Sequence, residues 1–197
     1  MTLEFFPTLV LTVVMLCWFA FGAIFVLRKK PPSAPDLKRD RSSIIGFALQ
    51  ALSYGMVLGA PREPFTTLII SGSEPLAVIA SIVAVFMAVS SVSLIMAAIK
   101  TLGREWSVTA RLVEGHRLAT SGPYAYVRHP IYTGMLGMLL ATGIAVSDWK
   151  VIIAALVVFF IGTIIRVRSE EKLLSGAFGP EFDVYSQRVR AIIPGLY

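Results

Sequence analysis

Residues 131–166, IYTGMLGMLLATGIAVSDWKVIIAALVVFFIGTIIR, decide the fold of this chain. They contain two uncharged apolar runs, 131–147 and 151–165, and the only charged residues between these runs are Asp148 and Lys150. Long uncharged apolar runs are typical of helices that cross a bilayer. The short break therefore predicts a tight hairpin of two membrane-spanning helices, both short for a hydrocarbon core about 30 Å thick.

Three further apolar runs precede this hairpin, at residues 5–27, 42–60 and 75–99. Over the whole chain 56% of the residues are hydrophobic and 15% are charged, whereas a soluble domain carries roughly a quarter charged residues. We therefore predict an all-α integral membrane protein with five transmembrane helices, in which residues 1–197 form a single transmembrane domain. Residues 166–197 are expected to form a cytosolic helical segment that is broken at Gly179 and Pro180.

The basic residues fall almost entirely in the gaps on one side of the predicted spans. Sixteen of the 18 lysines and arginines lie after the first span, after the third span or in the tail, and only Arg62 and Lys150 lie on the other side. Because cytoplasmic loops carry the excess of basic residues, the N-terminus is predicted outside and the C-terminus in the cytosol. The basic residues follow the first run, so we expect a retained helix and not a cleavable signal.

The sequence lacks the familiar motifs of metal and nucleotide chemistry. It contains no G-x-x-x-x-G-K-[ST] loop, no H-E-x-x-H motif and no C-x-x-C pair. His116 and His129 are its two histidines, and Cys17 is its one cysteine. Two histidines with scattered carboxylates make a poor closed ligand set, so no metal site is expected. No basic stripe with interleaved aromatics lies outside the apolar runs, so the expected partners are membrane lipids and not nucleic acid.

A polar stretch leads directly into the fourth apolar run: GHRLATSGPYAYVRHPIY, residues 115–132. Pro130 suits the first turn of a helix, where its missing N–H costs nothing. A helix start directs free N–H groups and the positive end of its dipole at whatever precedes it, so an anionic group could bind there with Arg128 and His129 as further donors. The alternative is that these two residues are interfacial anchors within a belt of tyrosines.

A second polar cluster follows the fifth apolar run. Arg166 and Glu170 are four residues apart, so they share one face of a helix at the cytosolic end of that span. A planar guanidinium can hold a carboxylate by two parallel hydrogen bonds. The alternative is an arginine that extends its charged end into the interfacial water and pairs with the glutamate.

These two clusters resemble the isoprenylcysteine carboxyl methyltransferase family and its prokaryotic relatives, over about residues 102–197. The first cluster is similar to the family's G-x-Y-x-x-x-R-H-P-x-Y stretch. The second has an arginine, three residues, a glutamate pair, and then Phe178 and Gly179. The resemblance implies a methyltransferase-like catalytic half at residues 101–197 that faces the cytosol from a prokaryotic cytoplasmic membrane.

The resemblance also implies S-adenosylmethionine as the cofactor and a lipophilic or lipidated acceptor, such as a prenylcysteine carboxylate. Arg166 and Glu170 would be the catalytic residues, with Arg166 at the position that faces the substrate carboxylate. The residues that would line the cofactor pocket, of which Arg117 and Ala119 match by position alone, are His116, Arg117, Leu118, Ala119, Tyr124, His129, Pro130, Ile131, Tyr132 and Glu170.

Three alternative functions stay open, because the R-H-P-x-Y stretch is shared with lipid methyltransferases and some sterol reductases. They are a phospholipid N-methyltransferase, an NADPH-dependent sterol-type reductase of the membrane, and a non-catalytic membrane subunit that packs against a partner. A reductase would be expected to carry more arginines for the cofactor phosphates. An amine or hydroxyl acceptor would need a base, for which Glu170 or His129 are the candidates. No feature of the sequence indicates an oligomeric state.

The basic-residue distribution predicts the outcome of reporter fusions. Fusions after Arg41 and at Tyr197 should report the cytosol, and a fusion near Ser71 should report the outer side, because sixteen of the 18 basic residues lie in the predicted cytosolic segments. The measurement is the activity of a compartment-specific reporter at each point. Signals from the same side at Ser71 and Tyr197 would contradict the five-span topology.

Overall fold

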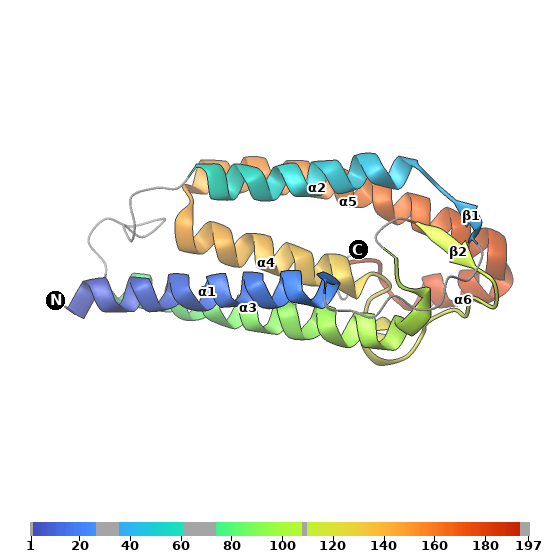
Figure 1. Ribbon diagram of the computed structural model, residues 1–197, viewed down its shortest axis with the longest axis horizontal. Helices are drawn as coiled ribbons and strands as arrows, with labels where there is room; N and C mark the ends of the chain where they lie inside the picture. The colour runs from blue at the N-terminus through green and yellow to red at the C-terminus, as the bar shows by residue number, and fades with distance from the viewer. Residues whose placement is uncertain (1, 27–35, 61–73, 108–109, 194–197) are drawn as a thin grey trace. The chain divides into compact units, whose positions relative to one another are not determined.

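The computed structural model describes residues 2–26, 36–60, 74–107 and 110–193 (Figure 1). Helices account for most of the described chain, and two short strands pair with each other. In chain order the elements are α1 Thr2–Val26, β1 Asp36–Arg39, α2 Ser42–Gly59, α3 Glu74–Leu102, the 3-10 helix η1 Gly103–Glu105, β2 Arg111–Val113, the 3-10 helix η2 Gly122–Ala125, α4 Pro130–Val146, α5 Trp149–Phe178 and α6 Pro180–Arg188.

Each of the five apolar runs forms a helix. Among the described residues, three helical stretches are long and apolar enough to cross a membrane, namely Ser42–Gly59, Pro75–Leu102 and Trp149–Phe178. Thr8–Ile24 and Pro130–Val146 are apolar but shorter. The chain is therefore an integral membrane protein, while the five-span count and the orientation stay predictions. The basic residues at 28–30 and 62, and the fusion points at 71 and 197, lie outside the described residues.

The helix of the fifth apolar run extends beyond the predicted span. α5 continues through Arg166 and the charged segment after it without a break to Phe178. The break then comes at the predicted position, where Gly179 has a φ of 50° and Pro180 begins α6. The antiparallel pair of β1 and β2 was not predicted, since neither short segment has an alternating apolar pattern and the two are far apart in sequence.

The described chain divides into two compact units. The first comprises Met1–Arg28, Ala51–Ser93 and Gly134–Phe159. In it the Trp18 indole donates a hydrogen bond to Thr142 at 3.0 Å, and the Tyr54 hydroxyl donates to the Met135 carbonyl at 2.6 Å. A Cβ on Gly137 would lie 2.1 Å from the Ser91 hydroxyl, so this glycine serves close packing between α3 and α4.

The second unit comprises Lys29–Gln50, Leu94–Thr133 and Phe160–Tyr197, and it holds both polar clusters. Within it α2 and α5 meet backbone to backbone at two glycines. A Cβ on Gly46 would lie 2.5 Å from the Gly162 carbonyl oxygen, and a Cβ on Gly162 would lie 2.7 Å from the Gly46 carbonyl oxygen. Small residues at such crossings are typical of membrane helices, where contact replaces the hydrophobic effect as the driving force.

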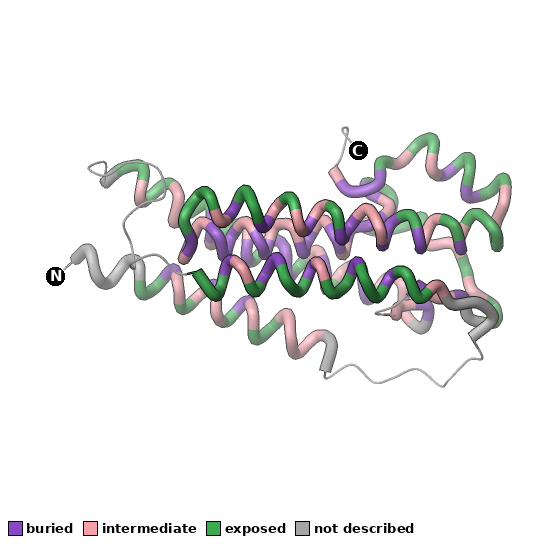
Figure 2. Tube along the Cα trace, turned by 90° about the horizontal axis from the view of Figure 1, so that it is seen from above, coloured by how far each residue is buried: buried purple, intermediate pink, exposed green. Residues whose placement is uncertain are grey.

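The burial pattern of α2 is that of a helix in lipid. Its buried positions recur with helical spacing and include Ser43, Gln50 and Ser53, whereas large apolar side chains such as Ile45 and Leu52 are exposed. Figure 2 shows the same succession of buried and exposed positions along the other helices. Polar side chains point inward because hydrocarbon offers them no hydrogen bonds.

We expect Gly162→Ala to destabilise the protein by about 1–3 kcal/mol, since overpacking at this crossing cannot be relieved by rotating a side chain. The added Cβ would lie 2.7 Å from the Gly46 carbonyl oxygen and 3.2 Å from the Gln50 backbone nitrogen. Thermal unfolding in detergent is the measurement. Gly176→Ala is the control on the same helix, because a Cβ there meets nothing within 4 Å. If both variants unfold at the wild-type temperature, α2 and α5 are not in backbone contact.

Candidate functional site: a buried ionic cluster between the start of α4 and the end of α5

Hydrogen bonds to residues near the C-terminus hold the start of α4 in place. The residues before this helix form backbone hydrogen bonds with residues 189–192, which we call the C-terminal strap. The Arg128 amide donates to the Arg190 carbonyl and the His129 amide to the Ala191 carbonyl, both at 2.8 Å. The Thr133 hydroxyl donates to the Ile192 carbonyl at 2.6 Å. Of the N–H groups that the sequence left available for an anion at this helix start, the strap thus satisfies that of His129.

Arg128 connects α5 to the strap. Its Nη2 lies 2.8 Å from Glu171 Oε1, and its Nη1 donates to the carbonyls of Ser186, at 2.9 Å, and Val189. The side chain is only 14% exposed. Arg128 is thus paired with acceptors of the protein, and its roles as a donor to a bound anion or as an interfacial anchor stay predictions. A buried guanidinium needs several acceptors, and this one takes them from the protein itself.

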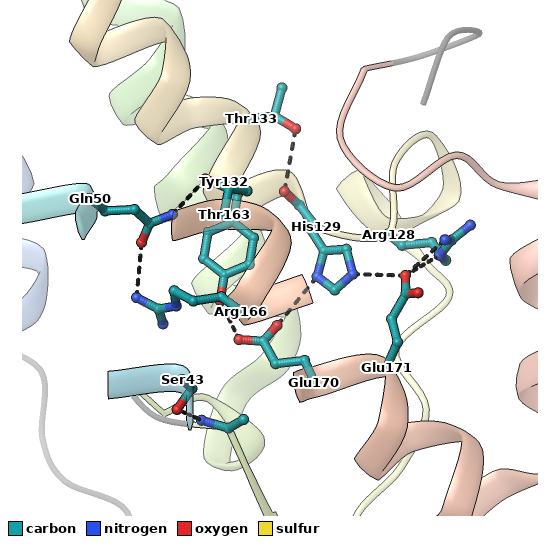
Figure 3. Close-up of polar contacts among 11 residues, drawn as sticks. Ser43, Gln50, Arg128, His129, Tyr132, Thr133, Thr163, Arg166, Glu170 and Glu171 are labelled. Atoms are coloured by element: carbon teal, nitrogen blue, oxygen red, sulfur yellow. Dashed lines mark hydrogen bonds and ion pairs between the residues drawn. The ribbon is translucent and has the colours of Figure 1, made fainter. Parts of the chain in front are cut away.

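His129 lies between two carboxylates, as Figure 3 shows. Its Nδ1 is 3.3 Å from Glu170 Oε2 and its Nε2 is 3.1 Å from Glu171 Oε1, with the side chain 5% exposed. Burial by itself lowers the pKa of His129, but the hydrogen bonds and negative charges of the two glutamates outweigh burial, so the net pKa is raised. The imidazolium form therefore links the start of α4 to Glu170 and Glu171 of α5.

Tyr132 and Arg166 extend the cluster. The Tyr132 hydroxyl donates to Glu170 Oε1, and its ring stacks on His129 with centroids 5.6 Å apart. The Arg166 guanidinium lies over the same ring, 4.9 Å from its centroid. Arg166 is 5% exposed, so it does not extend into the interfacial water. Its placement confirms that Arg166 and Glu170 share a helix face.

Gln50 on α2 is a member of the cluster that the sequence analysis missed. Its Oε1 accepts from Arg166 Nη1 at 3.1 Å, and its Nε2 donates to Thr163 Oγ1 at 2.8 Å (Figure 3). The amide is fully buried. The available signal was a glutamine inside an otherwise apolar run, since polar residues within membrane spans usually face the protein interior and mark functional sites.

The remaining predicted residues lie elsewhere in the second unit. The His116 ring is 6.0 Å from the Phe178 ring, and Arg117, whose side chain is 83% exposed, has its Nε 3.6 Å from Glu105. Leu118 and Ala119 are half-buried in the same loop. Tyr124 is buried in η2, and its carbonyl accepts from the Tyr185 hydroxyl at 2.7 Å. Pro130 and Ile131 form the first turn of α4.

The cluster offers two recognition elements of opposite charge. Glu170 is oriented by Tyr132 and His129, yet its side chain stays 27% exposed, so it can accept hydrogen bonds from a cationic group. Arg166 is a planar donor in a nearly water-free setting, where an anion would be held strongly. These donors and acceptors fit a cationic cofactor beside an anionic acceptor. Among the described residues, no group of three or more His, Cys, Asp or Glu side chains could hold a metal ion.

Comparisons with known proteins find a match to the part of the chain that contains most of the ionic cluster. Residues 81–176 match the model of the isoprenylcysteine carboxyl methyltransferase family. This region is isoprenylcysteine carboxyl methyltransferase-like. Most of the cluster falls inside it, namely Arg128, His129, Tyr132, Arg166, Glu170 and Glu171, whereas Gln50 and the C-terminal strap fall outside.

Individual relatives match over stretches of about half the chain. The chain is 34% identical over 99 residues to protein-S-isoprenylcysteine O-methyltransferase B of Arabidopsis thaliana, an alignment that covers 49% of the chain and 50% of that protein. It is 34% identical over 99 residues to the cobalt-zinc-cadmium resistance protein CzcN of Cupriavidus metallidurans, covering 49% and 44%. It is 32% identical over 115 residues to the nickel-cobalt-cadmium resistance protein NccN of Alcaligenes xylosoxydans xylosoxydans, covering 55% and 51%. The chain thus spans about half the length of the curated relatives it matches.

The ionic cluster of this methyltransferase-like region predicts a pH-dependent contribution to stability. Because the pKa of folded His129 is raised, its contribution is fully present below the unfolded pKa, about 6.5, and is lost as pH rises through the folded value. At pH 6 we expect His129→Gln to cost about 1.5–3 kcal/mol, the range for charge-assisted hydrogen bonds, and to cost less at pH 9. Thermal unfolding in detergent at both pH values measures the difference. A cost independent of pH would mean that the pKa of His129 is the same in the folded and unfolded states.

Proposed function

We propose that the chain is an S-adenosylmethionine-dependent methyltransferase that acts at the membrane on a lipophilic acceptor bearing a carboxylate. The observation that carries the proposal is the buried cluster of Arg166, Tyr132, Glu170 and His129, which presents a guanidinium beside an oriented carboxylate. The match of residues 81–176 to the family model supports the activity. The name of the Arabidopsis thaliana relative supports a prenylcysteine-type acceptor.

Arg166 would bind the acceptor carboxylate. A carboxylate is already ionised near neutral pH, so the transfer requires alignment and the exclusion of water more than acid–base chemistry. The guanidinium is fixed against the Tyr132 ring and by the Gln50 amide, and its fork can hold two carboxylate oxygens at once. Phe47 is an exposed apolar side chain whose ring centroid is 5.7 Å from the guanidinium carbon, so it would contact an acceptor that entered from the lipid beside it.

Glu170 would bind a cationic part of the cofactor, which supplies an activated methyl group on a sulfonium. The other residues proposed to line the pocket are His116, Arg117, Leu118, Ala119, Tyr124, Pro130, Ile131 and Tyr132. His129 would act by holding Glu170 in place, since both of its ring nitrogens already face carboxylates. If the acceptor were an amine or a hydroxyl, Glu170 would be the better base, because its side chain is 27% exposed and that of His129 is 5% exposed. The site would face the cytosol, as the distribution of basic residues predicts.

The test compares two cofactors and two variants. S-Adenosylhomocysteine, and not NADPH, should raise the unfolding temperature of the purified protein in detergent, and Glu170→Gln should abolish most of this stabilisation. Arg166→Lys should keep it but lower kcat/KM for a prenylated thiol carboxylate about 10-fold or more, because a charge-assisted hydrogen bond contributes about 1.5–3 kcal/mol and lysine lacks the planar fork.

Two exposed positions provide matched controls. Arg168→Lys on α5 and Glu181→Gln on α6 repeat the same chemical changes at exposed side chains. Both should behave as wild type, since exposed charges contribute about 0–1 kcal/mol. Stabilisation by NADPH alone would favour the reductase. No stabilisation by either cofactor would favour the non-catalytic subunit.

A further inference from the structure

Gln50 is a fully buried amide in a helix that otherwise presents apolar side chains to its surroundings. It lies outside residues 81–176, so the family match does not account for it. Burying an amide is costly unless each polar atom is hydrogen-bonded, and within a membrane span the cost is greater. The partners of Gln50 therefore show what the amide does.

The orientation of the Gln50 amide is determined by its neighbours. Arginine can only donate hydrogen bonds, so the atom 3.1 Å from Arg166 Nη1 must be the amide oxygen. The amide nitrogen then donates to Thr163 Oγ1 at 2.8 Å. This arrangement requires α2 and α5 to lie very close, and the contact of Gly46 with Gly162, one turn before Gln50 and Arg166, provides that proximity.

The net charge of the cluster depends on the fact that the Gln50 side chain is uncharged. Glu171 faces Arg128 and His129, and Glu170 faces His129 and Tyr132. With His129 protonated, Arg128, His129 and Arg166 carry three positive charges against the two negative charges of Glu170 and Glu171, so the cluster keeps one net positive charge, and the charge of Arg166 also acts on Glu170. A glutamate at position 50 would have the same shape as glutamine but would cancel that charge.

We infer that Gln50 is a positioning residue that holds the Arg166 guanidinium in a fixed plane without neutralising it, and that it thereby sets the preference of the site for an anionic acceptor. The inference rests on the proposed function, in which Arg166 receives the acceptor carboxylate. It assigns to α2 a part of the acceptor site. Thr163 contributes indirectly, because its hydroxyl keeps the amide oxygen directed at Arg166.

The test uses a pair of acceptor probes that differ in charge alone, a prenylated thiol carboxylic acid and its carboxamide. Binding of each to the full-length protein in detergent is measured by calorimetry in the presence of S-adenosylhomocysteine. Wild type should bind the acid at least 10-fold more tightly than the amide. Gln50→Glu should remove this preference by weakening acid binding, while its affinity for S-adenosylhomocysteine stays within two-fold of wild type.

Two further variants separate charge from orientation. Thr163→Val should weaken acid binding several-fold and leave amide binding unchanged, because the Gln50 amide is then no longer held with its oxygen toward Arg166. Gln187→Glu, the same change at an exposed position on α6, should bind both probes as wild type does. If Gln50→Glu fails to fold, the binding of the acid and the amide to Thr163→Val alone tests the inference.

The outcomes distinguish this inference from the proposed function. An unchanged acid preference in folded Gln50→Glu, or in Thr163→Val when Gln50→Glu does not fold, overturns the inference and leaves the methyltransferase proposal standing. A wild-type protein that binds neither S-adenosylhomocysteine nor the acid overturns both. Equal loss of acid and amide binding in Gln50→Glu would mean that Gln50 only supports the packing of α2 on α5, and would also overturn the inference.

Discussion

The ionic contact of His129 with Glu170 and Glu171 is the interaction on which the rest of the site depends. It joins the first turn of α4 to the cytosolic end predicted for α5, at a side chain that is 5% exposed. Buried charges are stable only when each is paired and hydrogen-bonded, so the positions of the neighbouring groups are tightly constrained. Tyr132 and Arg128 complete this pairing, and the same contacts that stabilise the charges also orient Glu170 for binding.

The environment of the helices explains why the cluster takes this form. Apolar side chains gain little by turning inward from lipid, so membrane helices associate through close contact and interior hydrogen bonds. The crossing at Gly46 and Gly162 follows this rule, and it brings the Gln50 amide against Arg166. Packing and recognition are therefore coupled here, because the two glycines that allow the helices to touch also set the place of the guanidinium.

The region that resembles the methyltransferase family does not build its site alone. Residues 81–176 contain the charged side chains, but their positions depend on two segments outside the match. Gln50 comes from α2, and the C-terminal strap binds the backbone that leads into α4. The surroundings of Arg166 are therefore determined in part by segments outside the matched region.

The sequence by itself determined the membrane character, the helices, the start of α4 at Pro130 and the break at Gly179, because these follow from local apolar length and from residues with restricted backbones. It also placed Arg166 and Glu170 on one face, since helical spacing is a local property. Only the tertiary structure decided that Arg128 binds the strap, that His129 lies between two carboxylates and that Gln50 meets Arg166. Those contacts join segments far apart in the chain, and which buried polar groups become partners depends on how the helices pack.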